Sequence, residues 1–273
     1  DEFITLCQTI KDKGDMSPLV VGGSDVWHIG FLYDLCYAND VLESDPDFIE
    51  ECYKGEKDFS DANYQKAVTD LAEVLSFAQD GWASTPDAQI TTFFVNDMSA
   101  MMFSGTHMFS QINDAAPDFE YGWFAVPDRD GKVNLLGGGT AGGWALSAEA
   151  AKDPDKQAAF DAFCKYFFSS DVYGAYCEAM AAIPTTVETP KMNTSEQFKS
   201  VLDALSAADY THLMWNQEVG NRELPPDFRN FTYKTCIEVA QGSRDVASAS
   251  SELQKTWNVA LQSFNPTTGL GVE

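Results

Sequence analysis

One amphipathic stripe gives the strongest structural signal in the chain. Within residues 61–80, apolar side chains recur every three or four positions, as they do along one face of a helix. They are Tyr64, Val68, Leu71, Leu75 and Ala78. The stripe predicts a helix that packs one face on a core, and the glycine that follows, Gly81, is typical of a helix C-cap.

The same spacing predicts further helices, and short apolar runs predict strands between them. Helices are expected at residues 1–13, 27–38, 87–96, 172–180, 195–208, 226–241 and 245–263. Strands are expected at residues 17–21, 100–103, 121–126, 133–136 and 144–146. Helices that alternate with short strands favour an α/β fold.

Two local signals refine this pattern. Asp153 followed by Pro154 has the residue types preferred at a helix N-cap and first position, so another helix is expected to start there. Asp130-Gly131 is typical of a tight turn and predicts a hairpin between the strands at 121–126 and 133–136.

Composition and charge restrict the class of protein. The chain has 273 residues, 44% of them hydrophobic, which is enough for one large or two ordinary domains with packed cores. Its formal net charge is −25, spread along the sequence, and such a field repels nucleic acids and anionic membranes. We therefore expect no nucleic-acid partner. No run of 18 apolar residues is present, so no membrane span is expected.

The cysteines, histidines and common motifs do not indicate an active site. None of the six cysteines forms a C-x-x-C pair, and we expect buried free thiols. The three histidines lack metal-binding spacing, and neither a nucleophile elbow nor a P-loop occurs. Asp128-x-Asp130-Gly131 lacks the other ligands of a calcium loop, so a turn is preferred. We expect no cofactor, no metal and no catalytic residue.

A glycine-rich segment at residues 137–143 contains Gly137-x-Gly139-x-x-Gly142. In a dinucleotide-binding fold this motif follows a strand and opens a helix, whereas here it precedes a strand-like run that begins at Trp144. The segment is better explained as a loop at a crossing between domains, because glycines allow the backbone to approach a ligand closely.

Several tryptophans lie beside small or polar residues at the ends of expected elements. They are Trp27, Trp82, Trp144 and Trp215. A sugar ring stacks its C–H face on an aromatic ring while polar neighbours bind its hydroxyls, so a sugar site is one interpretation. Burial in a core is the other. Trp123 and Trp257 lie on apolar faces of regular elements and are expected in the core.

The order of short motifs resembles the later part of bacterial extracellular solute-binding proteins of the carbohydrate ABC-transporter type, the group of the maltose-binding protein. The matching segments are Asp1–Gly14, Gly22–Trp27, Phe94–Met101, Ser104–His107, Tyr121–Pro127, Gly138–Ser147 and Ile183–Thr186. Each segment is loose alone, but their order and spacing together are specific, and they cover nearly the whole chain.

This resemblance implies a periplasmic-binding-protein-like fold with two α/β lobes and a ligand cleft between them. Residues 1–141 and 187–273 would form the C-terminal-type lobe. Residues 142–186 would belong to the other lobe and include the hinge crossings. The chain would hold mostly one lobe plus part of the other, and it would be truncated at its N-terminus.

The resemblance also implies a set of ligand contacts. Asp25 and Trp27 follow the first strand, where the family contacts sugar. His107 stands where the family usually carries an aromatic residue, so a polar contact is expected there. Trp144 ends the glycine-rich loop, and Arg229 is the nearest match to a contact residue of the helix at 226–241.

The implied function is delivery of a sugar or oligosaccharide to an ABC importer, without catalysis. The partners would be the sugar and the membrane subunits of the transporter. The protein would be extracytoplasmic, either periplasmic or a membrane-anchored lipoprotein. The helix from Pro154 carries an aromatic stripe that the missing part of its lobe would cover. In the chain alone the stripe would be exposed or covered by a dimer partner.

Two other functions remain open from the sequence. An extracellular carbohydrate-active enzyme would use a pair of carboxylates about 5–10 Å apart in a cleft, and 42 acidic residues offer many pairs. A structural or interaction domain would lack a concave aromatic pocket.

Overall fold

The chain forms two compact units. A computed structural model describes residues 2–128, 130–136, 143–186, 188, 190–264 and 266. Unit 1 consists of Asp1–Gly105, Ala125–Gly138 and Ala207–Glu273, and unit 2 of Thr106–Phe124 and Gly139–Ser206. The lobe boundaries predicted from the sequence, 1–141 with 187–273 and 142–186, stay a prediction.

Unit 1 contains most of the regular structure. Its elements are α1 (Glu2–Lys13), β1 (Ser17–Val20), α2 (Val26–Tyr37), the π-helix η1 (Ala38–Leu42), α3 (Phe48–Lys54), α4 (Ala62–Leu75), η2 (Trp82–Ser84), α5 (Asp87–Val95), β2 (Ser99–Met102), β3 (Asn134–Leu136), β4 (Tyr210–His212), η4 (Trp215–Gln217), η5 (Gly220–Arg222), α10 (Phe228–Ala240) and α11 (Val246–Ala260). The predicted helices and the first two strands are confirmed, with ends shifted by a few residues.

Both sheets of the described chain are small and parallel. Strand β1 pairs with β2, and Leu19 lies opposite Met101. Strand β3 pairs with β4, and Leu135 lies opposite Thr211. Parallel neighbours need a crossover connection, and α2, α4 and α5 lie between β1 and β2 along the chain. This arrangement confirms the predicted α/β class.

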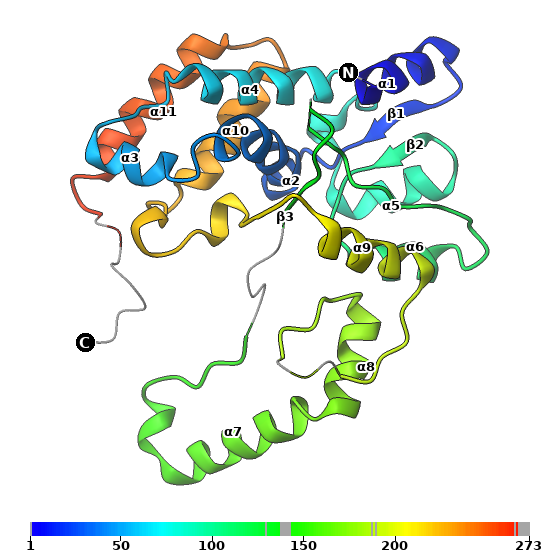
Figure 1. Ribbon diagram of the computed structural model, residues 1–273, viewed down its shortest axis with the longest axis vertical. Helices are drawn as coiled ribbons and strands as arrows, with labels where there is room; N and C mark the ends of the chain where they lie inside the picture. Colours follow the sequence, from blue (N-terminus) through cyan, green and yellow to red (C-terminus); the bar gives the residue numbers. More distant parts are fainter. Residues whose placement is uncertain are drawn as a thin grey trace. The chain divides into compact units, whose positions relative to one another are not determined.

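The core of unit 1 lies among its helices. Helices α2, α4 and α10 contact one another, and α11 packs on α4 and α10 (Figure 1). Trp215 and Trp257 are 1% and 0% exposed within this aromatic core. Thus the C-terminal helices pack on the N-terminal part of the chain. Trp257 is in the core as predicted, and the core alternative holds for Trp215.

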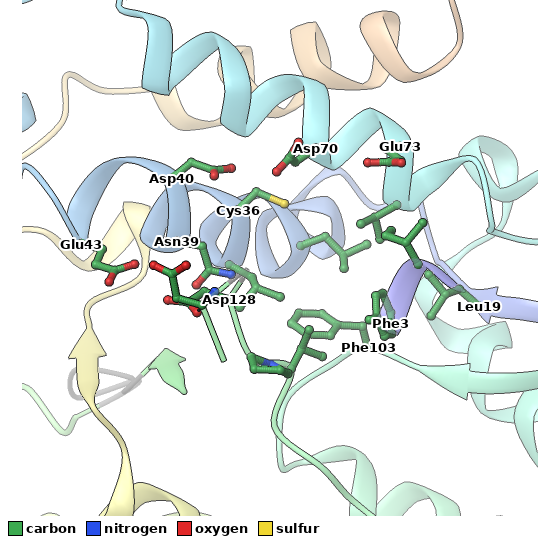
Figure 2. Close-up of a pocket in the computed structure, with 17 residues that line it drawn as sticks. Phe3, Leu19, Cys36, Asn39, Asp40, Glu43, Asp70, Glu73, Phe103 and Asp128 are labelled. Atoms are coloured by element: carbon green, nitrogen blue, oxygen red, sulfur yellow. The ribbon is translucent and has the colours of Figure 1, made fainter. Parts of the chain in front are cut away.

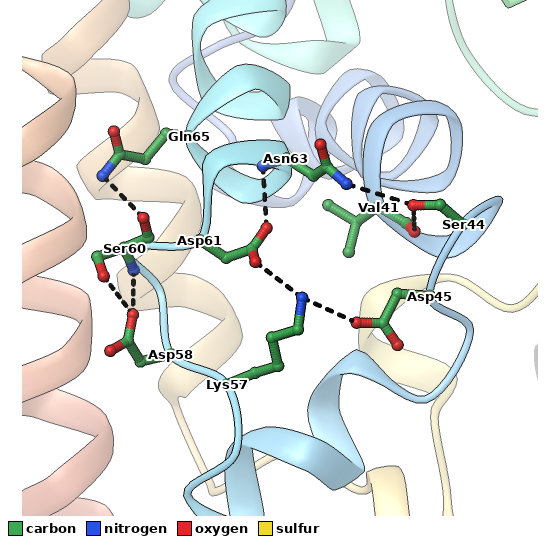
Figure 3. A network of polar contacts seen from close by, with 9 residues as sticks. All are labelled: Val41, Ser44, Asp45, Lys57, Asp58, Ser60, Asp61, Asn63 and Gln65. Atoms are coloured by element: carbon green, nitrogen blue, oxygen red, sulfur yellow. Dashed lines mark hydrogen bonds and ion pairs between the residues drawn. The ribbon is translucent and has the colours of Figure 1, made fainter.

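A polar network secures the start of α4 (Figure 3). Asp61 caps the helix, since its Oδ1 accepts a hydrogen bond from the Asn63 backbone N–H at 2.9 Å. Lys57 Nζ lies 2.8 Å from the other oxygen of Asp61 and 3.6 Å from Asp45 Oδ2. The capped end fixes where the amphipathic helix begins.

The end of α4 differs from the prediction. The helix stops at Leu75, and Gly81 instead precedes η2 with φ of +75°. The cause is pairing with β1. The Leu19 N–H donates to the Phe77 carbonyl at 3.2 Å, and the Gln79 N–H donates to the Leu19 carbonyl at 3.0 Å. These bonds replace further helical turns.

The predicted hairpin is wrong. The turn itself is present, because Asp128 Oδ1 accepts from the backbone N–H groups of Asp130 and Lys132. However, residues 121–126 form no strand, and β3 pairs with β4 instead. Residues 144–146 form no strand either. Local periodicity predicted these segments without showing which partner strand was within reach.

Unit 2 is smaller and, in its described residues, helical without a strand. Its elements are α6 (Met108–Ala115), η3 (Ala150–Lys152), α7 (Pro154–Phe167), α8 (Ser170–Met180) and α9 (Glu196–Ala207), which ends at the unit boundary. Asp153 caps α7 as predicted, accepting from Asp155 N at 3.0 Å. A small core gathers around Phe109, Phe198 and Val201.

Helix α7 has no buried residue among those described. Phe163 is 40% exposed and Phe168 is 45% exposed. The expectation that the aromatic stripe lies uncovered in this chain is therefore met. The dimer suggested from the sequence stays a prediction.

Replacing Gly174 of α8 should destabilise unit 2. An added Cβ would overlap the Lys191 carbonyl oxygen, because the segment after α8 folds back onto the helix. Alanine normally stabilises a helix interior by about 1 kcal/mol relative to glycine. The clash should reverse that sign, and overpacking of this kind costs roughly 1–3 kcal/mol. Denaturant unfolding of Gly174→Ala measures it. Gly122→Ala, whose Cβ would meet nothing within 4 Å, is the matched control; equal stability of both variants would contradict the close approach.

No helix in the described part of the chain is both long and apolar enough to cross a membrane.

Candidate ligand-binding site

The loop between β1 and α2 is held tightly against the region before α5. A Cβ on Gly22 would lie 2.7 Å from Asp87 Cα, and one on Gly23 would lie 2.6 Å from the Trp82 ring. The Gly23 N–H donates to the Trp82 carbonyl at 2.9 Å. Only glycine permits this approach, so the two glycines of the family-like segment serve packing.

Asp87, the first residue of α5, contacts two residues at the start of α2. The Asp25 carboxylate accepts a hydrogen bond from the Asp87 backbone N–H at 2.7 Å, which caps α5 from outside its own segment. The His28 ring nitrogen Nδ1 lies 2.7 Å from Asp87 Oδ1. His28 is fully buried, whereas Asp25 is only partly so. One carboxylate oxygen of Asp25, a predicted ligand contact, is thus used in a structural hydrogen bond.

Trp27 lies between Asp25 and His28 along the chain, and the residue is 42% exposed. Its ring centroid lies 5.8 Å from those of His28 and Phe31, both in edge-on geometry. A large exposed aromatic ring on a fixed helical turn is the arrangement that stacks on a sugar face. Of the five predicted contacts, Trp27 has the clearest geometry for binding.

Arg229 lies in the first turn of α10, a helix that contacts α2. Burial raises the pKa values of Asp34 and Tyr233, and the charge of Arg229 opposes both rises. Asp34 is seven residues beyond Trp27, or about 10 Å along a helix at 1.5 Å per residue. Arg229 and Trp27 lie on contacting helices of unit 1.

The other two predicted contacts belong to unit 2. His107 occupies the N-cap position of α6. Trp144 is 54% exposed, and its ring packs edge-on against Phe163 and Phe167 of α7, with centroids 5.0 and 5.4 Å away. Most of the glycine-rich loop, residues 137–142, lies outside the described residues. Convergence of all five residues on one ligand stays a prediction.

Several polar side chains surround the buried Asp34 in unit 1. The Tyr233 hydroxyl donates a hydrogen bond to Asp34 Oδ1 at 3.3 Å. Burial raises the pKa of Asp34 well above its usual value, the nearby Glu218 adds to the rise, and Arg229 opposes it. Burial also raises the pKa of Glu218.

Replacing Asp34 by asparagine should raise the melting temperature by a few degrees at neutral pH. The folded protein holds Asp34 at a pKa above that of the unfolded chain, so folding favours the protonated form. The resulting stability is present below the unfolded pKa of about 4 and is lost as pH rises through the folded value. The asparagine amide cannot ionise, so the advantage of the variant should shrink towards pH 4. Thermal melts from about pH 4.5 to about pH 7.5, all above the unfolded pKa, test it. The exposed Asp203→Asn is the control, and a constant difference across pH would contradict the interpretation.

A cavity of about 330 Å³ lies within unit 1 (Figure 2). Figure 2 shows the carboxylates of Asp40, Asp70 and Glu73 along one side and the rings of Phe3 and Phe103 on the other. None of the five predicted contacts lines this cavity. The five contacts predicted from the sequence therefore do not belong to this cavity.

The carboxylates of Asp40 and Asp70 in this cavity are candidates for the catalytic pair of a carbohydrate-active enzyme. Burial raises the pKa of Asp40, which is the property required of a general acid. However, the ammonium of Lys66 contacts Asp40 and lies 3.0 Å from Asp70 Oδ2. The lysine occupies the space between the carboxylates, where a glycosidic bond would have to lie. This pair forms an ion cluster rather than a pair of hydrolytic groups.

The described residues contain no group of three or more His, Cys, Asp or Glu side chains placed to hold a metal ion. All six cysteines are free thiols, five of them buried as expected of core residues and Cys164 partly exposed. Burial raises the pKa of Cys7 to about 11, so this thiol is protonated at neutral pH.

Sequence reasoning missed His28 and Asp87 because it weighed His28 only as a metal ligand. A usable signal was present: His28 follows Asp25 by three residues, which places both on one side of a first helical turn. The partner, Asp87, is 59 residues from His28 and could not be inferred from local pattern.

Comparison with known proteins identifies the class. Residues 1–201 match the family described as bacterial extracellular solute-binding protein, and the chain belongs to this family. Among curated proteins, none matches the chain in sequence. The family consists of binding proteins rather than enzymes, and its extracellular role implies a location outside the cytoplasm.

Solved structures of sugar-binding proteins share the fold. A chitin oligosaccharide binding protein is 18% identical, with a TM-score of 0.76 over 95% of this chain and 64% of its own. A sugar transporter protein from Bacillus licheniformis in complex with stachyose is 16% identical, with a TM-score of 0.75 over 95% and 66%. The solute-binding protein RafE in complex with raffinose is 18% identical, with a TM-score of 0.71 over 95% and 65%. The chain spans just under two thirds of the length of these proteins, and the predicted fold class is confirmed.

Proposed function

We propose that the protein binds a sugar or oligosaccharide outside the cytoplasm and delivers it to an ABC importer without chemical change. The observation that carries the proposal is the exposed ring of Trp27 on a rigid turn, in a chain that belongs to the solute-binding family. Sugar-bound structural neighbours support the choice of ligand class.

The proposed contacts divide by chemistry. Trp27 and Trp144 would supply aromatic faces, and both are about half exposed. Asp25, His107 and Arg229 would hydrogen-bond hydroxyls, for which Asp25 has one carboxylate oxygen not used in capping α5. The ligand would be held between the lobes, as the family resemblance implies. A lipid anchor or a free periplasmic form would keep the protein near its transporter.

Calorimetric titration of the purified protein against stachyose, raffinose and a chitin oligosaccharide tests this function. We expect one sugar to bind in a 1:1 complex and to be recovered intact. Absence of binding across an extended oligosaccharide panel would contradict the ligand class. Release of shorter sugars during incubation would instead favour the carbohydrate-active enzyme.

A further inference from the structure

We propose that His28 is a positioning residue of the sugar site, which fixes the ring of Trp27 through its contact with Asp87. The proposal rests on the sugar-binding function, and it assigns to His28 an indirect role. His28 is fully buried and therefore cannot be reached by a ligand in this structure.

The first turn of α2 depends on contacts from outside the helix. Asp25 occupies the N-cap position, but its side chain makes no hydrogen bond to the N–H groups of its own helix. It bonds the Asp87 backbone N–H instead, at 2.7 Å. A helix start without a side-chain cap is free to fray unless another group holds it.

His28 supplies the second hold on the same turn. Its Nδ1 lies 2.7 Å from Asp87 Oδ1, so Asp25 and His28 are both attached to one residue of α5. Trp27 lies between the two attachment points along the chain. Its backbone is therefore held on both sides, while the residue remains 42% exposed.

Hydrogen-bond chemistry identifies the donor of the contact between His28 and Asp87. An ionised carboxylate only accepts hydrogen bonds, so Nδ1 must be the donor to Asp87. The other nitrogen, Nε2, is buried and has no hydrogen-bond partner among the described residues. The Nδ1 donor is thus directed at Asp87.

The ring of His28 also contacts the ring it positions. The centroids of Trp27 and His28 are 5.8 Å apart, and Phe31 lies 5.9 Å from His28 on the next turn. These three aromatic side chains form an edge-on cluster, and His28 anchors it by a polar contact to another helix. Loss of that anchor should let the Trp27 ring move, even if α2 remains folded.

Two substitutions distinguish the effect of the His28 hydrogen bond from the effect of its side-chain volume. The amide nitrogen of asparagine stands at the same distance from Cβ as Nδ1, so His28→Asn keeps a donor towards Asp87. His28→Leu fills similar volume without a donor. We expect His28→Leu to weaken binding of the tightest sugar of the panel about tenfold, within the range of coupling between contacting residues. His28→Asn should stay within about twofold of wild type.

A double-mutant cycle shows whether the effect passes through Trp27. In the Trp27→Ala background, His28→Leu should cause no further loss of sugar affinity. Acrylamide quenching of Trp27 fluorescence, obtained as the difference from matched Trp27→Phe proteins, should increase in His28→Leu and not in His28→Asn. Thermal melts of each variant show that the measured samples are folded.

The outcomes distinguish failure of the positioning role of His28 from failure of the proposed sugar-binding function. Additive losses in the cycle, or unchanged quenching in His28→Leu, would overturn positioning through Trp27 and leave His28 a core residue. If no sugar binds the wild-type protein, the sugar-binding function fails, and the quenching comparison still decides whether His28 fixes the Trp27 ring.

Discussion

Replacing Trp257 by alanine should remove about 3–5 kcal/mol from the free energy of unfolding, the usual cost of deleting a buried aromatic side chain. Trp257 is 0% exposed. Its ring contacts those of Tyr53, Phe59 and Phe228, with centroids 4.6, 5.5 and 5.1 Å away. These partners come from three segments, so the cavity would loosen the packing of α11 on the rest of unit 1.

Denaturant unfolding followed by circular dichroism measures this loss. Val259→Ala is the matched control because Val259 lies on the same helix and is 64% exposed. Surface substitutions of that kind usually change stability by less than about 0.5 kcal/mol. A typical domain has only about 5–15 kcal/mol of stability, so Trp257→Ala removes a large share of it and the measurement belongs at low temperature. Equal stability of the two variants would contradict the described core.

Periodicity predicted the helices well because burial of one face is a property of local sequence. The stripe from Tyr64 to Leu75 is buried as α4, and Asp153 caps α7 where the sequence placed the cap. The end of α4 escaped prediction because residues 77–79 bond to Leu19, which is distant in sequence. Glycine at position 81 has the residue type of a cap, but tertiary pairing ended the helix first.

Strand pairing shows the same limit. The turn at Asp130 was predicted from residue types that favour it, whereas β3 pairs with β4, more than 70 residues later in the chain. Neither strand is longer than three residues, so each carries little periodic signal. A hairpin is the shortest connection a sequence can suggest, and the structure uses a longer one.

The candidate site follows this pattern too. Trp27 was predicted as a contact from the family resemblance, and its position beside polar residues at an element end left both a sugar site and a core open; its exposure fits the first. Trp215 had a similar sequence neighbourhood, yet it is buried against Tyr37, with ring centroids 4.7 Å apart. Exposure separates the two tryptophans, and exposure depends on tertiary packing that local composition does not encode.

Replacing Trp27 by alanine should weaken sugar binding by roughly 1–3 kcal/mol, about 5- to 150-fold in dissociation constant, if its ring anchors the ligand. The ring is exposed, so its removal should leave the fold intact. Its contribution to stability comes chiefly from edge-on contacts with His28 and Phe31. Calorimetric titration with the tightest sugar of the panel measures the change. Trp27→Phe retains an aromatic face and should lose less. Tyr166 lies on α7 and is 66% exposed, and Tyr166→Ala should leave affinity unchanged. Wild-type affinity in Trp27→Ala would exclude Trp27 from the site, whereas a loss in Tyr166→Ala of equal size would point to a general effect of removing exposed aromatic rings.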